Sequence, residues 1–141
     1  MKKKSTDDLM RDLACAPSFD AYSRRNTASF SDSRVAELLS QIYEKKSITK
    51  AALARQAGIS EVYLHQVFSG RRMPSRDRLL CICIALELAL EETQDLLKRA
   101  SYAQLYPRIQ RDAIISYGIL HHMDLEEINQ TLFAENEKTL S

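Results

Sequence analysis

The segment from Thr49 to Gly70 constrains the fold more than any other part of the chain. It predicts two short helices, opened by Thr49 and Ser60, whose hydroxyl groups can accept hydrogen bonds from the free N–H groups of a first turn. Gly58 lies between them, where a residue without a Cβ atom adopts a positive φ at little cost. Ala54 is small enough to let the helices approach closely. The segment therefore predicts two short helices that cross at a tight turn.

The second of these helices has two different faces when its residues are placed about 100° apart. The arc predicted to be buried is apolar and holds Tyr63, Leu64, Val67 and Phe68. The opposite arc holds Val62, His65, Gln66 and Ser69, with Glu61 at its edge. Gln66 can bind adenine through two hydrogen bonds, His65 can donate to guanine, and Val62 can contact a thymine methyl group. The pattern indicates a helix-turn-helix whose second helix fits the DNA major groove.

A basic loop follows this helix and contains Arg71, Arg72 and Arg76. Guanidinium groups in such a loop can bind phosphates and so fix the register of the protein on DNA without reading its sequence. The alternative is an ordinary helical hairpin with a solvated basic loop. We favour nucleic-acid binding because the turn, the two capping residues, the small residue and the basic loop occur together.

This segment resembles the lambda-repressor-like (Cro/cI, XRE) helix-turn-helix family, and the resemblance extends over residues 32–100. The matching string is Thr49-Lys-Ala-Ala-Leu-Ala-Arg-Gln-Ala-Gly-Ile-Ser-Glu-Val-Tyr-Leu-His-Gln-Val-Phe-Ser-Gly-Arg-Arg-Met-Pro-Ser75. The resemblance implies a five-helix bundle that binds double-stranded DNA, usually as a homodimer on a palindromic or repeated site. This chain departs from the common family pattern at Lys50, Glu61 and Phe68.

The resemblance also implies roles for individual residues. The residues expected to face bases are Glu61, Val62, His65 and Gln66, and Tyr63 is expected near the DNA backbone. The residues expected to face phosphates are Thr49, Lys50 and Ser60. A carboxylate at Glu61 favours cytosine N4 and is repelled by phosphate.

The charge of the chain is distributed unevenly although its net value is only +1. Residues 32–80 carry nine basic and five acidic side chains, whereas residues 81–141 carry five basic and ten acidic ones. With only three glycines and three prolines and no sustained β-type alternation, the composition indicates an all-α protein. A basic central segment followed by an acidic one fits a DNA-binding domain with a protein-facing extension, although chance clustering is an alternative.

Enzymatic, metal-binding and membrane functions find no support in the sequence. The three cysteines form no metal or disulfide pattern, and adjacent His121 and His122 point about 100° apart, which does not suit joint metal ligation. Glu61 and His65 predict a weak surface contact rather than a catalytic pair. The N-terminal lysines precede no apolar signal segment, and the longest apolar run is too short to span a bilayer. We therefore expect a cytoplasmic protein without enzymatic activity or cofactor.

The sequence divides into three regions. Residues 1–31 predict an N-terminal arm with short helices at 6–14 and 18–25 and a linker from Asn26 to Ser31; a solvated tail is the alternative. Residues 32–100 predict the DNA-binding bundle, with a first helix at 33–46 and a central helix beginning after Ser75. Residues 101–141 predict a helical hairpin packed on the bundle or on a dimer partner.

An internal repeat supports the last two regions. Arg76-Asp77, Leu79-Leu80, Leu90-Glu91-Glu92 and Leu97 recur thirty-five positions later as Arg111-Asp112, Ile114-Ile115, Leu125-Glu126-Glu127 and Leu132. Asp124 and Glu127 predict a capping box at the start of a helix in the second copy. If the copies share a shape, the first also bends near residues 87–89; coincidence between Leu- and Glu-rich helices is the alternative.

The C-terminal apolar stripe, Ala113, Ile114, Tyr117 and Leu120, allows two interpretations: intramolecular packing or a subunit interface. The sequence as a whole predicts an all-α, dimeric, sequence-specific transcriptional regulator. The alternatives are a protein-interaction adaptor that keeps the bundle but has little DNA affinity, and an antitoxin-like regulator that binds a protein partner as well as DNA.

Overall fold

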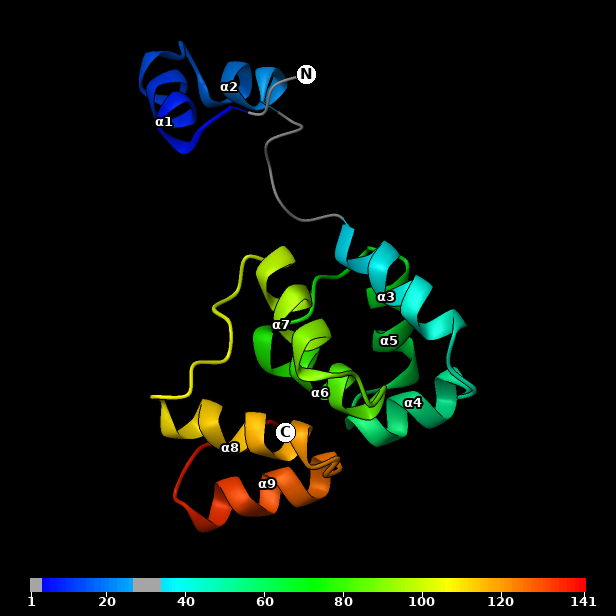
Figure 1. The fold of residues 1–141 in the computed structure, drawn as a ribbon. Helices are drawn as coiled ribbons and strands as arrows, with labels where there is room; N and C mark the ends of the chain where they lie inside the picture. Colours follow the sequence, from blue (N-terminus) through cyan, green and yellow to red (C-terminus); the bar gives the residue numbers. More distant parts are fainter. Residues whose placement is uncertain (1–3, 27–33) are drawn as a thin grey trace. The chain divides into compact units, whose positions relative to one another are not determined.

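The computed structural model describes residues 4–26 and 34–141, and within these ranges all regular structure is α-helical (Figure 1). The chain divides into two compact units, residues 1–31 and 32–141, which we describe separately. None of the helices in the described ranges has the length and hydropathy that crossing a bilayer requires.

The first unit contains α1 (Thr6–Cys15) and α2 (Phe19–Arg25). The hydroxyl groups of Ser5 and Ser18 accept hydrogen bonds from backbone N–H groups in the first turn of each helix, as N-capping residues do. These helices agree with the two short helices that the sequence predicted. The rest of the predicted linker, residues 27–31, and the predicted helix start at Ser33 lie outside the described residues.

The second unit begins with a five-helix bundle. Its helices are α3 (Arg34–Glu44), α4 (Lys50–Ala57), α5 (Glu61–Phe68), α6 (Arg76–Ala85) and α7 (Leu90–Arg99). The α6 helix packs against α4 and α7, and all six residues from Leu79 to Ile84 are buried. A helix that is apolar on every side belongs at the centre of a bundle, so the structure confirms the sequence prediction for α6.

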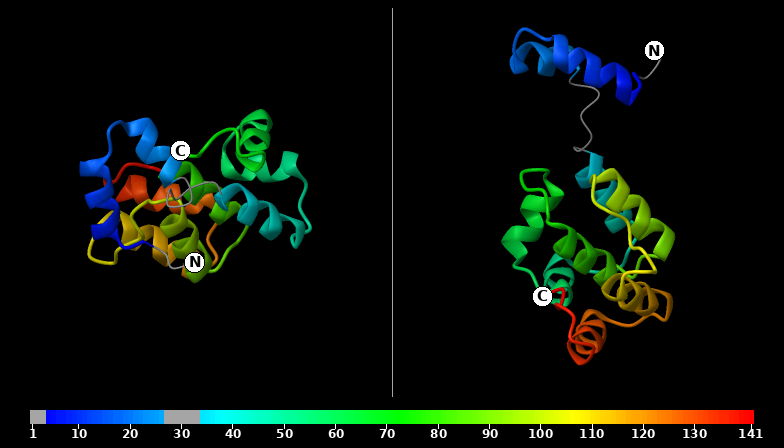
Figure 2. Two further views of the ribbon diagram at one scale, coloured as in Figure 1. Left: turned by 90° about the horizontal axis from the view of Figure 1, so that it is seen from above. Right: turned by 90° about the vertical axis from the view of Figure 1, so that its left-hand side faces the viewer.

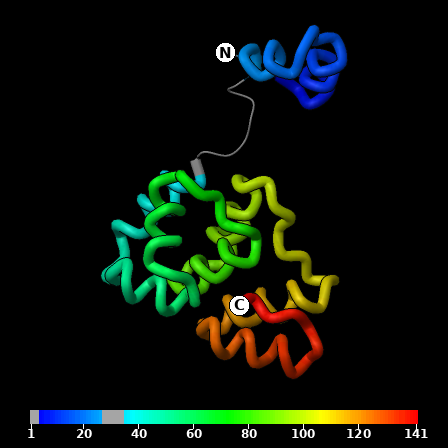
Figure 3. Tube along the Cα trace, turned by 180° about the vertical axis from the view of Figure 1, so that it is seen from behind, coloured from blue at the N-terminus to red at the C-terminus, as the bar shows by residue number. Residues whose placement is uncertain are grey.

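A helical hairpin of α8 (Gln110–Leu120) and α9 (Leu125–Ala134) completes the second unit. The two views in Figure 2 show α8 and α9 side by side at one end of the bundle. Seen from behind in Figure 3, the C-terminal segment returns from α9 toward the middle of the bundle. There the Leu140 carbonyl accepts a hydrogen bond from the Cys81 thiol of α6. The C-terminal segment therefore belongs to the folded unit.

The structure confirms the predicted repeat and the predicted break between α6 and α7. Left-handed residues occur at equivalent places in the two hairpins, thirty-five positions apart: Glu87 and Ser101 in the first, with φ of 56° and 63°, and His122 and Asn136 in the second, with φ of 56° and 59°. A side chain at positive φ is uncommon. Its recurrence at both equivalent places makes coincidence between similar helices a poor explanation of the repeat.

The two hairpins also exchange equivalent ion pairs. Arg76 of the first hairpin pairs with Asp112 of the second, at 3.2 Å between Nη2 and Oδ2. Arg111 of the second pairs with Asp77 of the first, at 3.0 Å between Nη1 and Oδ1. Likewise, α7 packs on α8 and α6 packs on α9. Such reciprocal contacts indicate that the hairpins are related by an approximate two-fold axis, as the subunits of a symmetric dimer are.

The connecting segments are held in equivalent ways too. Arg76 Nε donates a hydrogen bond to the Ala103 carbonyl at 2.9 Å, and Arg111 Nε donates one to the Lys138 carbonyl at 2.8 Å. Side-chain amides fix the next positions: the Gln94 and Asn129 oxygens accept hydrogen bonds from the backbone N–H groups of Leu105 and Leu140. The repeat therefore includes the extended segment after each hairpin as well as the helices.

Candidate nucleic-acid interface

The turn between α4 and α5 follows from local capping. Thr49 Oγ1 accepts a hydrogen bond from Ala52 N, and Ser60 Oγ accepts one from Tyr63 N, both close to 3 Å. Gly58 ends α4 with φ of 69°, and its N–H donates to the Arg55 carbonyl. The two capping residues and the left-handed glycine lie where the sequence predicted them.

Packing then fixes the direction in which α5 presents its side chains. Leu64 and Val67 of α5 are buried in the core, where Leu53 and Ala57 of α4 are also buried. Residues on the opposite side of α5 are exposed: Glu61, Val62 and His65, with Val62 exposing 69% of its surface. Gln66 is half-buried. The base-facing residues named from the sequence therefore share the outward face of α5.

Tyr63 and Phe68 pack against the core as the sequence predicted, but both remain half-buried. Cations lie against both rings. The Lys50 ammonium is 5.6 Å from the Phe68 ring centre, and the guanidinium carbons of Arg72 and Arg78 are 5.6 and 4.5 Å from that of Tyr63. Aromatic rings attract cations over their faces. These contacts hold three positive groups around the edges of α5.

The loop after α5 is anchored to the helix by its backbone. The Gln66 carbonyl accepts hydrogen bonds from Arg71 N at 3.0 Å and from Arg72 N at 3.2 Å, and Gly70 takes φ of 80°. The side chains of Arg71 and Arg72 are exposed. Both guanidinium groups therefore extend from a fixed backbone next to the outward face of α5.

Arg76 occupies a different place from the one predicted. Its guanidinium group binds both carboxylate oxygens of Asp112, at 3.3 and 3.2 Å, and the Ala103 carbonyl. The prediction of a phosphate contact is corrected, because this guanidinium group joins the two hairpins instead. The spacing in the sequence could not show this, since Asp112 lies thirty-six residues away.

Sequence reasoning missed Arg78, which is exposed in the first turn of α6 and lies over Tyr63. Its position two residues after Arg76 was the available signal. The predicted contact between Glu61 and His65 is present, with 3.6 Å between Oε1 and Nε2 on exposed side chains. The carboxylate at the start of α5 therefore lies beside the His65 imidazole on the next turn of the helix.

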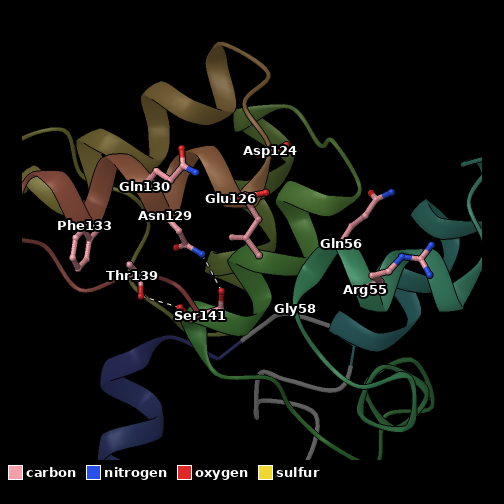
Figure 4. Close-up of a pocket in the computed structure, with 11 residues that line it drawn as sticks. Arg55, Gln56, Gly58, Asp124, Glu126, Asn129, Gln130, Phe133, Thr139 and Ser141 are labelled. Carbon is pink, nitrogen blue, oxygen red and sulfur yellow. Dashed lines mark hydrogen bonds between the residues drawn. The ribbon is translucent and has the colours of Figure 1, made fainter.

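The C-terminal hairpin and the segment after it contact the turn between α4 and α5. A Cβ atom on Gly58 would lie 3.7 Å from Ser141 and 3.8 Å from Leu125. Figure 4 shows the neighbouring groove, which is lined on one side by Arg55 and Gln56 of α4 and on the other by side chains of α9 and the C-terminal segment. Asn129 Nδ2 donates a hydrogen bond to Ser141 Oγ there at 2.9 Å. Leu125 of α9 and the C-terminal Ser141 therefore lie against the turn between α4 and α5.

The described residues offer little for metal or thiol chemistry. Within residues 4–26 and 34–141, no three His, Cys, Asp or Glu side chains are close enough together to hold a metal ion. Burial raises the pKa of the Cys81 thiol to about 11 and that of the Cys83 thiol to about 12. Both groups therefore stay protonated near neutral pH, and protonated thiols are poor nucleophiles.

This arrangement defines an all-α protein with a helix-turn-helix DNA-binding fold. A family model described as a helix-turn-helix domain matches residues 25–96, just over half of the chain. The protein belongs to this helix-turn-helix family, which confirms the resemblance found in the sequence. The family indicates a DNA-binding regulator, and its domain is typically non-enzymatic. No match was found among curated proteins or among solved structures.

Proposed function

We propose that the protein is a sequence-specific transcriptional regulator that reads the DNA major groove with α5. The observation that carries this proposal is the outward face of α5, which is exposed, largely neutral and bordered by cations fixed at its edges. In this proposal Gln66 pairs with adenine, His65 donates to guanine, and Val62 contacts a thymine methyl group. Glu61 accepts from cytosine N4 at the edge of the same face.

We assign phosphate binding to the groups around α5. The proposed contacts are Thr49, Lys50, Ser60, Tyr63, Arg71 and Arg72, to which we add Arg78. The N-terminal ends of α4 and α5 favour anions because their first N–H groups and helix dipoles point outward. The guanidinium carbons of Arg72 and Arg78 lie 5.6 and 4.5 Å from the Tyr63 ring centre, and such contacts favour ordered guanidinium groups before DNA binds. Pre-ordered groups lose less entropy on binding.

We further propose that residues 32–100 form the DNA-binding bundle and that residues 101–141 support it and carry a subunit interface. One recognition helix contacts only a few base pairs, and a homodimer doubles this readout on a two-fold symmetric site. No cofactor is required for this mode of binding.

A protein-interaction adaptor is the second candidate, and one observation favours it. Glu61 places a carboxylate at the entrance of the proposed groove-binding face, and the adjacent Val62 side chain is 69% exposed. An apolar, partly acidic face fits a protein surface as well as a base edge. The two candidates differ in their response to salt, because only phosphate binding releases counterions.

The experiment is a fluorescence anisotropy titration of the full chain with a random-sequence DNA duplex at 50 and 200 mM salt. The test variant is Arg71→Glu/Arg72→Glu. The matched control is Lys98→Glu/Arg108→Glu, which makes the same charge change at exposed positions away from α5. We expect the wild type to lose roughly tenfold or more in affinity between the two salt concentrations.

The test variant should bind every sequence at least tenfold more weakly and show a smaller salt dependence, whereas the control should stay close to wild type. Equal losses in both variants would show that only net charge matters and would refute the assigned site. A wild type without salt-sensitive binding would support the adaptor instead.

A further inference from the structure

The second hairpin has an exposed apolar face, whereas the equivalent face of the first hairpin is largely buried. A shallow hollow between α8 and α9 is lined by Ala113, Ile114, Tyr117, Met123, Thr131 and Glu135. Tyr117 and Leu120, on the same side of α8, each expose 58% of their surface. Large apolar side chains that line up on one face of a helix mark an interaction site when they remain exposed together.

The repeat shows what such a face does in the first hairpin. The positions equivalent to Ile114, Tyr117 and Thr131 are Leu79, Ile82 and Leu96, and all three of these are fully buried. There, α6 packs against α4, α7 packs against α3, and the Arg78 guanidinium lies over Tyr63 of α5. Helices therefore cover most of this face in the first hairpin; Ala85, the equivalent of Leu120, is half-buried, and Arg78, the equivalent of Ala113, is exposed. In the second hairpin, no other helix of the second unit, as described over residues 34–141, covers the equivalent face.

We propose that a second copy of this chain covers this face, with α8 of each copy packed antiparallel against α8 of the other. We call Ile114, Tyr117 and Leu120 the α8 stripe. In an antiparallel pair centred on Tyr117, this side chain meets its own copy, and Leu120 lies beside Ile114 of the partner subunit. A two-fold interface of this kind needs a surface that is complementary to itself.

The polar ends of the stripe meet this requirement. His121 and His122 lie exposed at the C-terminal end of α8. Gln110 begins α8 at its other end, where its amide nitrogen donates a hydrogen bond to Glu135 of α9 at 3.4 Å. Antiparallel packing brings the histidine end of one copy to the carboxylate end of the other, at both ends of the interface. Donors then face an acceptor, and like charges do not meet.

The existing hairpin packing in this chain provides a precedent. The first and second hairpins already pack on each other with reciprocal contacts. The same 35-residue unit thus forms an approximately symmetric helical interface within one chain. The purpose of the proposed dimer, to place two α5 helices on a two-fold DNA site, rests on the proposed function. The interface itself requires no DNA.

Sedimentation equilibrium of the full chain without DNA tests the interface. We expect the wild type to be dimeric at tens of micromolar, and Leu120→Glu to raise the dimer Kd by roughly thirtyfold or more, as loss of a central apolar contact does. The matched control is Phe133→Glu, which places the same charge at a 77% exposed apolar residue outside the hollow. A monomeric wild type, or equal weakening by both variants, would overturn the proposal.

A disulfide test locates the two-fold axis directly. Tyr117→Cys and Phe133→Cys are each made in a Cys15→Ser background, because Cys15 is exposed whereas Cys81 and Cys83 are buried. We expect Tyr117→Cys to form a covalent dimer on mild oxidation and Phe133→Cys to remain monomeric on a denaturing gel. Equal cross-linking of both, or none at position 117, would refute antiparallel α8 packing.

Both tests are made without DNA, so their failure is distinct from failure of the proposed function. A dimer that shows no salt-sensitive DNA binding would refute the regulator and retain the interface. A monomeric protein that binds DNA in a salt-sensitive way would refute the interface and retain the regulator.

Discussion

The two C-terminal hairpins have related sequences and the same backbone, yet they differ in what covers them. The α6–α7 hairpin is covered on one side by the helix-turn-helix and on the other by its repeat, so that its first helix is buried all round. The α8–α9 hairpin packs on the first hairpin and leaves a face open, with Tyr117 where the first hairpin has buried Ile82. The same fold therefore serves as a core in one place and as a surface in the other.

The buried residues between the two helices of each hairpin also differ between the two copies of the repeat. In the first hairpin Cys83 and Thr93 face each other, and both are buried. Their equivalents are Gly118 and Ile128, so the residue on the first helix is smaller and the residue on the second helix is larger than in the first hairpin. Compensation of this kind preserves the helix separation while the volume is redistributed, as close packing requires.

The largest expected effect comes from truncating equivalent positions on the two hairpins. Ile82→Ala should lower the free energy of unfolding by about 3 kcal/mol because it leaves a cavity in the core. Tyr117→Ala should change it by less than about 1 kcal/mol at concentrations where the protein is monomeric, because the side chain is exposed. Urea unfolding followed by circular dichroism measures both. Similar losses of unfolding free energy in the two variants would mean that Tyr117 is as well covered as Ile82.

The reciprocal ion pairs should also be unequal. Asp112 is buried, and its side chain is only 5% exposed, whereas that of Asp77 is 25% exposed. Arg76→Ala should therefore cost about 3 kcal/mol, since it leaves a buried charge without its partner. Arg111→Ala should cost about half as much, because water reaches Asp77. The same unfolding measurement checks the order, and a larger loss for Arg111→Ala would contradict it.

Changes at Gly118 and Ile128 should have an intermediate effect on the free energy of unfolding. A Cβ atom on Gly118 would lie 2.4 Å from Ile128 Cγ1, so Gly118→Cys should destabilise the protein by about 1–3 kcal/mol through overpacking. Combining it with Ile128→Thr reproduces the pair of the first hairpin. The double variant should lose less stability than the sum of the two single changes. Strict additivity would show that the two positions do not compensate each other.

The smallest change concerns thiol reactivity. Burial raises the pKa of Cys83 from 9.0 to about 12, so at pH 8 the group stays a thiol, and reagents reach it less easily than the exposed Cys15. Alkylation of the native protein at pH 8 should therefore modify Cys15 and leave Cys81 and Cys83 protected. Mass spectrometry locates the modified sites. Rapid modification of Cys83 without unfolding would contradict its burial.

Sequence reasoning succeeded where structure depends on neighbouring residues. Thr49, Gly58 and Ser60 act through hydrogen bonds and φ angles within one or two turns, so their roles follow from position alone. The break at Glu87 carries no glycine or proline and became predictable only through the repeat, in which Asp124 starts a helix by a capping box.

It failed where the partner lies far along the chain. Arg76 was predicted to bind phosphate because it follows a basic loop, and only the fold brings Asp112 to it. Arg78 was overlooked for the converse reason, since its contact with Tyr63 depends on where the fold places the first turn of α6. The environment of Phe68 likewise depends on a residue far along the chain, since the centre of the Tyr43 ring of α3 lies 5.2 Å from that of the Phe68 ring.

Selection of bound fragments from random-sequence duplex DNA tests the central claim most directly, because it asks whether the outward face of α5 distinguishes bases. The account predicts enrichment of a two-fold symmetric motif by the wild type, with loss of preference at one position in each half-site for Gln66→Ala. A recovered pool with the same composition as the input, or a motif unchanged by Gln66→Ala and His65→Ala, would contradict it.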